Sequence, residues 1–233
     1  MRARLLVGVL HASPVFASLP DQELATLASV SRRDLVRARD WIFAEGDPAS
    51  WLCLVERGRV KIMRHARTGK EVTLELLGPG EVFGGVAVIE RRPYPASAQA
   101  TESSVIVKLP AEAIASAAQR HPSIIREMAL MMGRRLRTAH DSVTSLVTDP
   151  VEARLASTLL RLADREGSRT ACGLALPFHL TRQGLADMAG TTVETTIRIM
   201  RRWINDGIVA DESGHFVLVD VPAVRALATG RPE

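Results

Sequence analysis

The chain has 233 residues, of which 46% are hydrophobic and 24% charged, and this composition excludes a disordered or fibrous protein. No apolar run near its start reaches the roughly 20 residues of a membrane-spanning helix or the roughly 7 to 15 of a secretory signal, so we expect a cytoplasmic protein with no membrane partner. Two cysteines are too few for a disulfide framework or a four-cysteine metal or iron–sulfur site, and a net charge of +4 only weakly favours an anionic partner.

Short runs rich in Val, Leu and Ile, separated by glycines, extend from about Leu35 to Leu109. Examples are residues 51–55, 60–63, 72–77 and 105–109. Strands at this spacing, with turn glycines between them, predict a small antiparallel sandwich or barrel-like roll.

From Pro122 to about Val147 the apolar residues repeat every 3.5 positions. The pattern fits two structures equally well: a two-stranded coiled coil, which implies a homodimer, or an ordinary helix packed on the core of its own domain. The residues of the predicted dimer seam are Ile125, Ala129, Met132, Leu136, Ala139, Val143 and Leu146.

A break follows at Asp149–Pro150, because proline disfavours a helical conformation in the residue before it. We interpret this dipeptide as a hinge. Residues 151–165 then have the apolar spacing of an amphipathic helix, and residues 175–180 are predicted to form a short strand.

The next segment has the pattern of a helix-turn-helix. Thr181 can cap a first helix that runs to Met188. Residues 189–192 supply a tight turn, in which Gly190 can adopt a positive φ. A second helix is predicted from about Val193.

The exposed face of that second helix predicts contact with DNA, although a solvated helix face is the simpler alternative for such an arginine cluster. Near the start of the helix, Arg198 can bond guanine and Glu194 can accept from cytosine, whereas Arg201 and Arg202 are better placed for phosphates. The candidate DNA-binding residues are Thr181, Arg182, Gln183, Thr192, Val193, Glu194, Thr195, Ile197, Arg198, Arg201 and Arg202.

Two short apolar runs, residues 208–210 and 215–219, follow the second helix and are joined through Glu212–Gly214. Strands in this arrangement predict a two-stranded wing beside the helix-turn-helix. The Gly turn and the following hairpin together favour DNA binding over a solvated face.

Five fragments resemble, in this order, the CRP/FNR transcription regulators: Ile42–Ala49, Leu54–Lys61, Leu77–Gly84, Thr181–Gln183 and Gly190–Arg198. The resemblance covers nearly the whole chain. It implies an α+β fold with an N-terminal antiparallel, jelly-roll-like β-roll, a long dimerisation helix and a C-terminal winged helix-turn-helix, and it favours the homodimer. The expected domains are an effector-sensing roll with an N-terminal helix at 1–121, the dimerisation helix at 122–148 and the DNA-binding domain at 149–233.

The resemblance also implies a function, the reading of double-stranded DNA at a pseudo-palindromic operator with one recognition helix per half-site. Glu194 and Arg198 match the base-reading Glu and Arg of the family. Val193 resembles the FNR-like branch, but Ile197 replaces the Ser of that branch, so the operator sequence stays open. Family activators contact RNA polymerase through a loop whose counterpart is about Asp164–Gly173.

The effector is not identified by the resemblance. Family members that bind cyclic nucleotides have a Glu where Gly85 stands and an Arg-Ser pair where Tyr94 and Pro95 stand, so cyclic AMP is not expected. An iron–sulfur cluster is not expected either, because the N-terminal segment has no cysteines, whereas haem or another small ligand at His140 stays open, with Cys53 nearby. Cys53 itself allows a redox switch or, as is usual for a cysteine in an apolar strand, a small buried hydrophobe. The candidate effector pocket is formed by Phe83, Gly84, Gly85, Tyr94, Pro95, Ala96, Met131, Arg135 and His140.

The alternatives to a DNA-binding regulator are an enzyme and a ligand-binding module. No catalytic or metal-binding sequence motif accompanies the histidines, so we do not expect an enzyme or a metal site. A ligand-binding regulatory module that does not read DNA is the stronger alternative, because the roll also resembles that of cyclic-nucleotide-gated channels and kinases. Such a module would have no use for residues 190–202.

Overall fold

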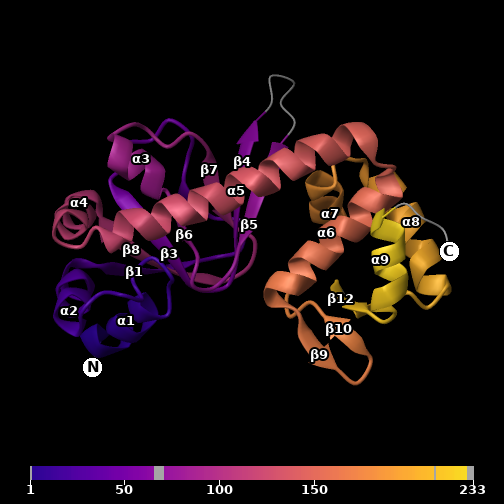
Figure 1. Ribbon diagram of the computed structural model, residues 1–233, viewed down its shortest axis with the longest axis horizontal. Helices are drawn as coiled ribbons and strands as arrows, with labels where there is room; N and C mark the ends of the chain where they lie inside the picture. Colours follow the sequence, from indigo (N-terminus) through magenta and orange to yellow (C-terminus); the bar gives the residue numbers. More distant parts are fainter. Residues whose placement is uncertain (1, 66–70, 213, 230–233) are drawn as a thin grey trace. The chain divides into compact units, whose positions relative to one another are not determined.

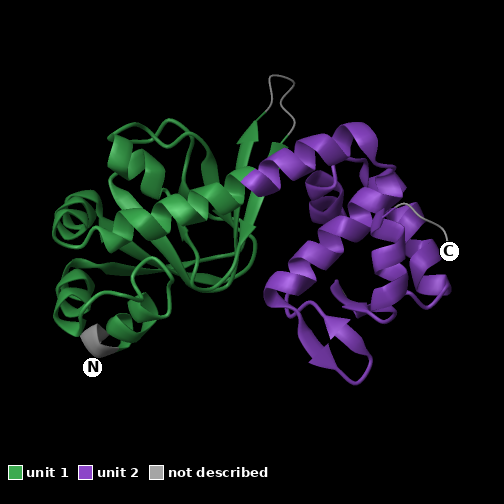
Figure 2. Ribbon diagram, viewed as in Figure 1, with its two compact units in different colours: residues 1–136 green, residues 137–233 purple. Residues whose placement is uncertain are grey.

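The computed structural model describes residues 2–65, 71–212 and 214–229, with the side chains of residues 2–4 left out. The chain forms two compact units, residues 1–136 and 137–233 (Figure 2). The boundary falls inside one long helix, α5 (Ser123–Thr148), so this helix contributes residues to both units.

The first unit contains two four-stranded sheets in which every strand pair is antiparallel (Figure 1). One sheet has the order β1-β8-β3-β6, with β1 at Arg32–Val36, β8 at Ser104–Pro110, β3 at Trp51–Arg57 and β6 at Val82–Phe83. The other has the order β2-β7-β4-β5, with β2 at Trp41–Phe43, β7 at Ser97–Ala100, β4 at Val60–His65 and β5 at Glu71–Leu77. The antiparallel β-roll predicted from the glycine-punctuated runs is therefore confirmed.

Alternation along β3 divides the core of this unit in two, because successive side chains of a strand point to opposite faces. Cys53 and Val55 face a cluster between the two sheets. Leu52 and Leu54 face a second cluster, to which the helices contribute. The helices of this unit besides α5 are α1 (Arg2–His11), α2 (Asp21–Val30), α3 (Gly85–Glu90) and α4 (Ala111–Arg120).

The helix α5 begins and ends within one residue of the predicted bounds. Its first turns have a buried side, with Ile124 and Met128 in the second cluster. The predicted seam lies elsewhere on the helix and is solvent-exposed in this single chain, with Leu136 56% and Val143 62% exposed. The helix ends at Thr148, and Pro150 takes the N-cap position of α6 (Val151–Glu166), which confirms the predicted break.

The second unit combines helices with a small antiparallel sheet of order β11-β12-β10-β9. Its elements after α6 are β9 (Ser168–Thr170), β10 (Gly173–Ala175), α7 (Arg182–Met188), α8 (Val193–Asn205), β11 (Val209–Glu212), β12 (His215–Leu218) and α9 (Val221–Thr229). The wing strands lie within about two residues of their predicted bounds, and Ser213 in their connection is outside the described residues.

One sequence prediction in this unit is wrong. The strand expected at 175–180 ends at Ala175. Beyond it, Leu176 and Leu180 still donate backbone hydrogen bonds to the β12 side of the sheet, but Pro177 between them has no N–H to continue a ladder. The segment 164–173, the expected counterpart of the polymerase-contacting loop, contains β9, a strand that the sequence did not predict because its three exposed residues show no apolar alternation.

Candidate nucleic-acid interface and effector region

The first helix of the helix-turn-helix is α7, and its start is fixed by a side-chain cap. The Thr181 hydroxyl accepts a hydrogen bond from the backbone N–H of Gly184 at 3.0 Å, as predicted. Two of the predicted DNA contacts beside it already have partners within the unit. Arg182 pairs with Asp211 at 2.7 Å, and the Gln183 amide donates to Asp187 at 2.8 Å.

The turn between the two helices depends on Gly190, which adopts φ +61° as predicted. A side chain at this position would be strained and would also collide with Leu146. Arg154 of α6 holds the turn from the other side: its guanidinium donates to the carbonyls of Ala189 at 2.9 Å, Gly190 at 3.1 Å and Asp149 at 2.9 Å. Sequence alone does not indicate a role for Arg154, because nothing in its neighbours along the chain reveals these carbonyl partners.

The second helix, α8, is positioned by its own cap and by an apolar face. The Thr192 hydroxyl accepts from the N–H of Thr195 at 3.2 Å. Ile199, Met200 and Trp203 recur at helical spacing and are buried. Their burial leaves the opposite face of α8 toward solvent.

That exposed face carries the side chains expected to read DNA. Glu194, Ile197, Arg198 and Arg201 are all exposed, with Ile197 at 40%. Glu194, Arg198 and Arg201 form no ion pair or side-chain hydrogen bond with any residue that the structure describes. An acid and two arginines are therefore available to an external partner, on the helix where the sequence analysis placed them.

Arg202 differs from its neighbours, because it is already paired. Its guanidinium bonds the carboxylate of Glu152 on α6, and the indole N–H of Trp203 donates to the same carboxylate at 2.8 Å. Partial burial would raise the pKa of Glu152, but the hydrogen bonds from Arg202 and Trp203 outweigh it and lower this pKa below its ordinary value. In the free protein, Arg202 is thus tied to α6 and is not oriented toward a phosphate.

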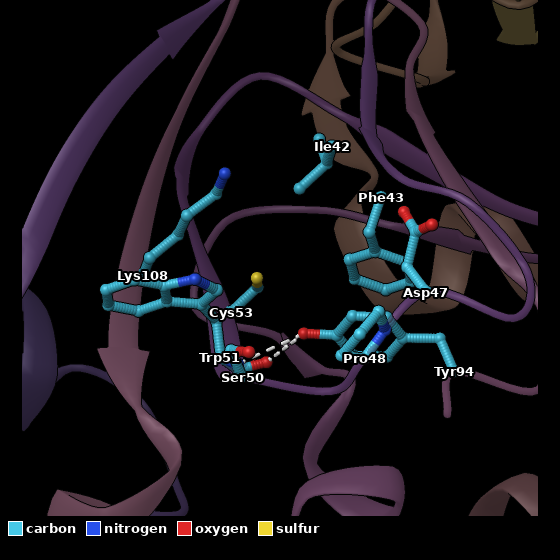
Figure 3. A pocket seen from close by; sticks show the side chains of 9 residues that line it. All are labelled: Ile42, Phe43, Asp47, Pro48, Ser50, Trp51, Cys53, Tyr94 and Lys108. Carbon is cyan, nitrogen blue, oxygen red and sulfur yellow. Dashed lines mark hydrogen bonds between the residues drawn. The ribbon is translucent and has the colours of Figure 1, made fainter. Parts of the chain in front are cut away.

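In the first unit, Tyr94 is a buried member of the predicted effector pocket, and Figure 3 shows it beside Phe43 and Trp51. Its ring is 3% exposed and stacks on Phe43, with 3.7 Å between ring centroids. Its hydroxyl donates to the carbonyl of Trp51 at 2.6 Å and accepts from the N–H of the same residue at 3.2 Å. Burial raises the pKa of Tyr94 to about 12, so the phenol stays neutral and presents no charge to an anion.

The two glycines of this region lie close to their neighbours. A Cβ at Gly84, where φ is +76°, would stand 2.9 Å from the Tyr94 ring. A Cβ at Gly85 would stand 2.5 Å from the end of the Met128 side chain and 2.9 Å from the end of Leu52. A Glu at position 85, as cyclic-nucleotide binders carry it, would therefore require both flexible side chains to move.

The other predicted pocket residues are dispersed. Arg135 pairs with Glu75 at 2.9 Å and donates to the Val82 carbonyl at 2.9 Å, while Met131 packs against the helix-bearing cluster. His140 is exposed and belongs to the second unit. The remaining three lie in the first unit, where Phe83 and Ala96 are buried and Pro95 is exposed.

Within residues 2–65, 71–212 and 214–229, no three His, Cys, Asp or Glu side chains gather in a way that could hold a metal ion. None of the helices that the structure describes is long and apolar enough to span a bilayer.

Two segments of the chain match known protein families. Residues 33–121 match the cyclic nucleotide-binding domain, and residues 153–227 match the Crp-like helix-turn-helix domain. A protein of Thermus thermophilus named cyclic AMP receptor protein is 31% identical over 94% of this chain and 98% of its own length. A Mycobacterium tuberculosis protein named CRP-like cAMP-activated global transcriptional regulator is 28% identical over 77% of this chain and 80% of its own length.

The fold has close counterparts among solved structures. The structure of FixK2 from Bradyrhizobium japonicum aligns with a TM-score of 0.75 over 85% of this chain and 97% of that one, at 23% identity. At this identity the likeness supports the fold alone.

Proposed function

Because the chain belongs to the CRP/FNR family of DNA-binding transcription regulators, which are not enzymes, we propose that it acts as a homodimer on a pseudo-palindromic operator. The observation that carries this proposal is the solvent-facing side of α8, where Glu194, Arg198 and Arg201 stand without partners among the described residues. Residues 153–227 match a DNA-binding domain, so the alternative of a module that does not read DNA is excluded.

Within this proposal the candidate DNA-binding residues take three roles. Glu194 and Arg198 read base edges in the major groove, and Ile197 contacts a thymine methyl. Arg201 neutralises a phosphate. Thr181 and Thr192 fix the starts of the two helices, so that the exposed backbone N–H groups of those helices can meet phosphates.

The dimer proposal rests on the seam of α5. Its large apolar residues Ile125, Leu136, Val143 and Leu146 are each between 42% and 62% exposed in the single chain. Two such helices packed along this seam would remove that apolar surface from water. We assign residues 122–148 to dimerisation, between a sensing domain at 1–121 and a DNA-binding domain at 149–233.

The effector in this proposal is a molecule other than cyclic AMP, or none. The Thermus relative is named for cyclic AMP, but here a neutral, hydrogen-bonded Tyr94 takes the place of the phosphate-binding Arg. The one arginine among the candidate pocket residues, Arg135, is already paired with Glu75. Addition of cyclic AMP should leave DNA affinity unchanged, and an increase in affinity would refute this part of the proposal.

Two further assignments follow the family resemblance. We place the regulator in the cytoplasm, with RNA polymerase as a partner at residues 164–173. The cofactor is not assigned, and haem at His140 stays an open alternative. A Soret band in purified protein supplemented with haem that His140→Ala abolishes would support this alternative, and a chain that takes up no haem would exclude it.

The proposal can be tested by selection of bound sequences from a random duplex library with the purified full chain. We expect a two-fold symmetric motif whose half-sites are about one helical turn apart, because each copy of the chain places one α8 in a major groove. Enrichment without symmetry would contradict the dimer, and the absence of any enriched sequence would contradict base reading.

A further inference from the structure

A cavity of about 300 Å³ lies in the first unit where β3 begins and β8 ends (Figure 3). It is at the small end of the size range of ligand pockets, about 300–1,000 Å³. Of the predicted effector residues only Tyr94 lines it, so it adjoins the pocket expected by resemblance and shares one residue with it. None of the residues proposed to contact DNA lines it.

Aromatic side chains form facing walls of this cavity. Trp51 stands on one side, and the stacked pair of Phe43 and Tyr94 stands on the other, as Figure 3 shows. The Tyr94 hydroxyl is already satisfied by the Trp51 backbone, and its ring is 3% exposed, so the partly exposed Phe43 ring supplies most of the surface that this pair presents to a ligand. Flat aromatic walls favour a flat aromatic guest in offset or edge-on contact.

Cys53 lines the cavity with a neutral, apolar group. Its side chain has no exposed surface in the folded unit, and burial raises the pKa of its thiol to about 12. A protonated thiol beside aromatic rings adds a polarisable contact and no charge.

Lys108 supplies a cation with spare bonding capacity. Its ammonium pairs with one oxygen of Asp34 at 3.2 Å, while Arg32 takes the other oxygen at 2.5 Å. Two cations therefore share one carboxylate, and Lys108 keeps N–H groups that Asp34 does not occupy. On the opposite lining, the Asp47 carboxylate accepts the backbone N–H of Ala44 at 2.8 Å and keeps its negative charge, so an anionic group is favoured at the Lys108 side of the cavity and disfavoured at the Asp47 side.

We propose that this cavity binds a small aromatic monocarboxylate, with the ring between Trp51 and the Phe43–Tyr94 pair and the carboxylate on Lys108. The charge-assisted bond to the ammonium selects a carboxylate over a neutral group of the same shape. The site concerns the first unit alone, so it goes beyond DNA binding, and its failure would leave that function standing.

The first test uses two probes of matched shape on the wild-type full chain. Isothermal titration calorimetry should show saturable binding of benzoate and at least about tenfold weaker binding of benzamide, which lacks the charge. Equal affinities, or no saturable heat from benzoate up to its solubility limit, would overturn the proposal. Because this comparison needs no variant, it remains decisive if a substitution impairs folding.

The second test locates the site with a matched pair of lysines. Lys108→Met should weaken benzoate binding at least about tenfold, because it keeps an apolar stem but removes the ammonium. Lys61→Met is the control: Lys61 is 22% exposed and paired with Glu71 at 3.0 Å, much as Lys108 is 18% exposed and paired with Asp34. The proposal fails if both variants lose affinity equally or if Lys108→Met binds as the wild type does.

Discussion

The three arginines near the middle of α8 have the same side chain and different surroundings. Arg198 and Arg201 are exposed and have no partner in the described chain, whereas Arg202 is bound to Glu152. The helical period of the sequence was enough to predict which face of α8 is exposed. It could not predict Glu152, because this partner lies fifty residues earlier and meets α8 only through tertiary packing.

Substitution of Arg198 should affect both affinity and base choice. Arg198→Ala should weaken binding to the selected operator by about 1 to 3 kcal/mol per half-site and relax preference at one base pair, because a bidentate contact to guanine is lost. Fluorescence anisotropy with the operator and with single-base variants measures both effects.

Arg201→Ala is the matched control on the same face. Because Arg201 is proposed to contact a phosphate, its replacement by Ala should lower affinity for all duplexes to a similar degree and leave base preference unchanged. If Arg198→Ala also weakened every duplex uniformly, Arg198 would be a phosphate contact too.

Release of Arg202 should increase DNA affinity. Glu152→Gln removes the carboxylate that holds the Arg202 guanidinium but keeps an oxygen for the Trp203 N–H. One additional phosphate contact per chain would steepen the dependence of log K on log salt by about 0.9 for each copy bound. The cost to folding should be about 1 kcal/mol or less, because the Arg202 side chain is 55% exposed.

The control for this variant is Asp164→Asn, which removes the same charge from a residue 62% exposed and 3.8 Å from Arg225. Anisotropy titrations at several salt concentrations compare the two. A salt dependence that steepens equally in both variants would show a general charge effect and would contradict a specific release of Arg202.

Among the elements, the long or capped helices were predicted correctly from sequence, whereas the shortest strands were not. The long helix α5 was predicted from its apolar repeat, and the pair α7 and α8 from their caps, Gly190 and an apolar period. The short strands β9 and β10 were missed or misplaced, since three-residue strands gain their stability from neighbours such as β12 and leave little pattern in sequence. The Phe43–Tyr94 stack was likewise not predictable, because it joins residues about fifty positions apart.

If two chains pack along the seam of α5, one charged substitution in this seam should dissociate the dimer. Leu136→Glu places a carboxylate on a residue that is 56% exposed in the single chain and central to the seam. Both copies lose an apolar contact of roughly 1.5–3 kcal/mol, so the dimer dissociation constant should rise at least about 100-fold. Analytical ultracentrifugation over a range of concentrations measures this change.

Leu130→Glu is the control, because Leu130 is similarly exposed at 51% but lies off the heptad seam. It should leave the dimer intact. Dissociation by Leu130→Glu with retention by Leu136→Glu would place the dimer interface on another face of α5.

Of the two units, the one that contains α8 does not carry the excess positive charge of the chain. Residues 1–136 carry nineteen Lys and Arg against fourteen Asp and Glu, whereas residues 137–233 carry eleven against twelve. The excess charge that weakly favoured an anionic partner thus belongs to the first unit. The proposed DNA-binding surface instead consists of a few arginines on one face of α8, in a unit that is nearly neutral.

This distribution predicts an unusually weak salt dependence for a dimeric DNA-binding protein. Arg198 and Arg201 give a dimer two to four cations on phosphates, depending on whether Arg198 contacts a base, and each neutralised phosphate contributes about 0.9 to the slope. We therefore expect log K to fall against log salt with a slope of about −2 to −4, measured by anisotropy on the selected operator. A slope of about −8 or steeper would mean that many other cations touch the duplex, and it would contradict a recognition surface confined to α8.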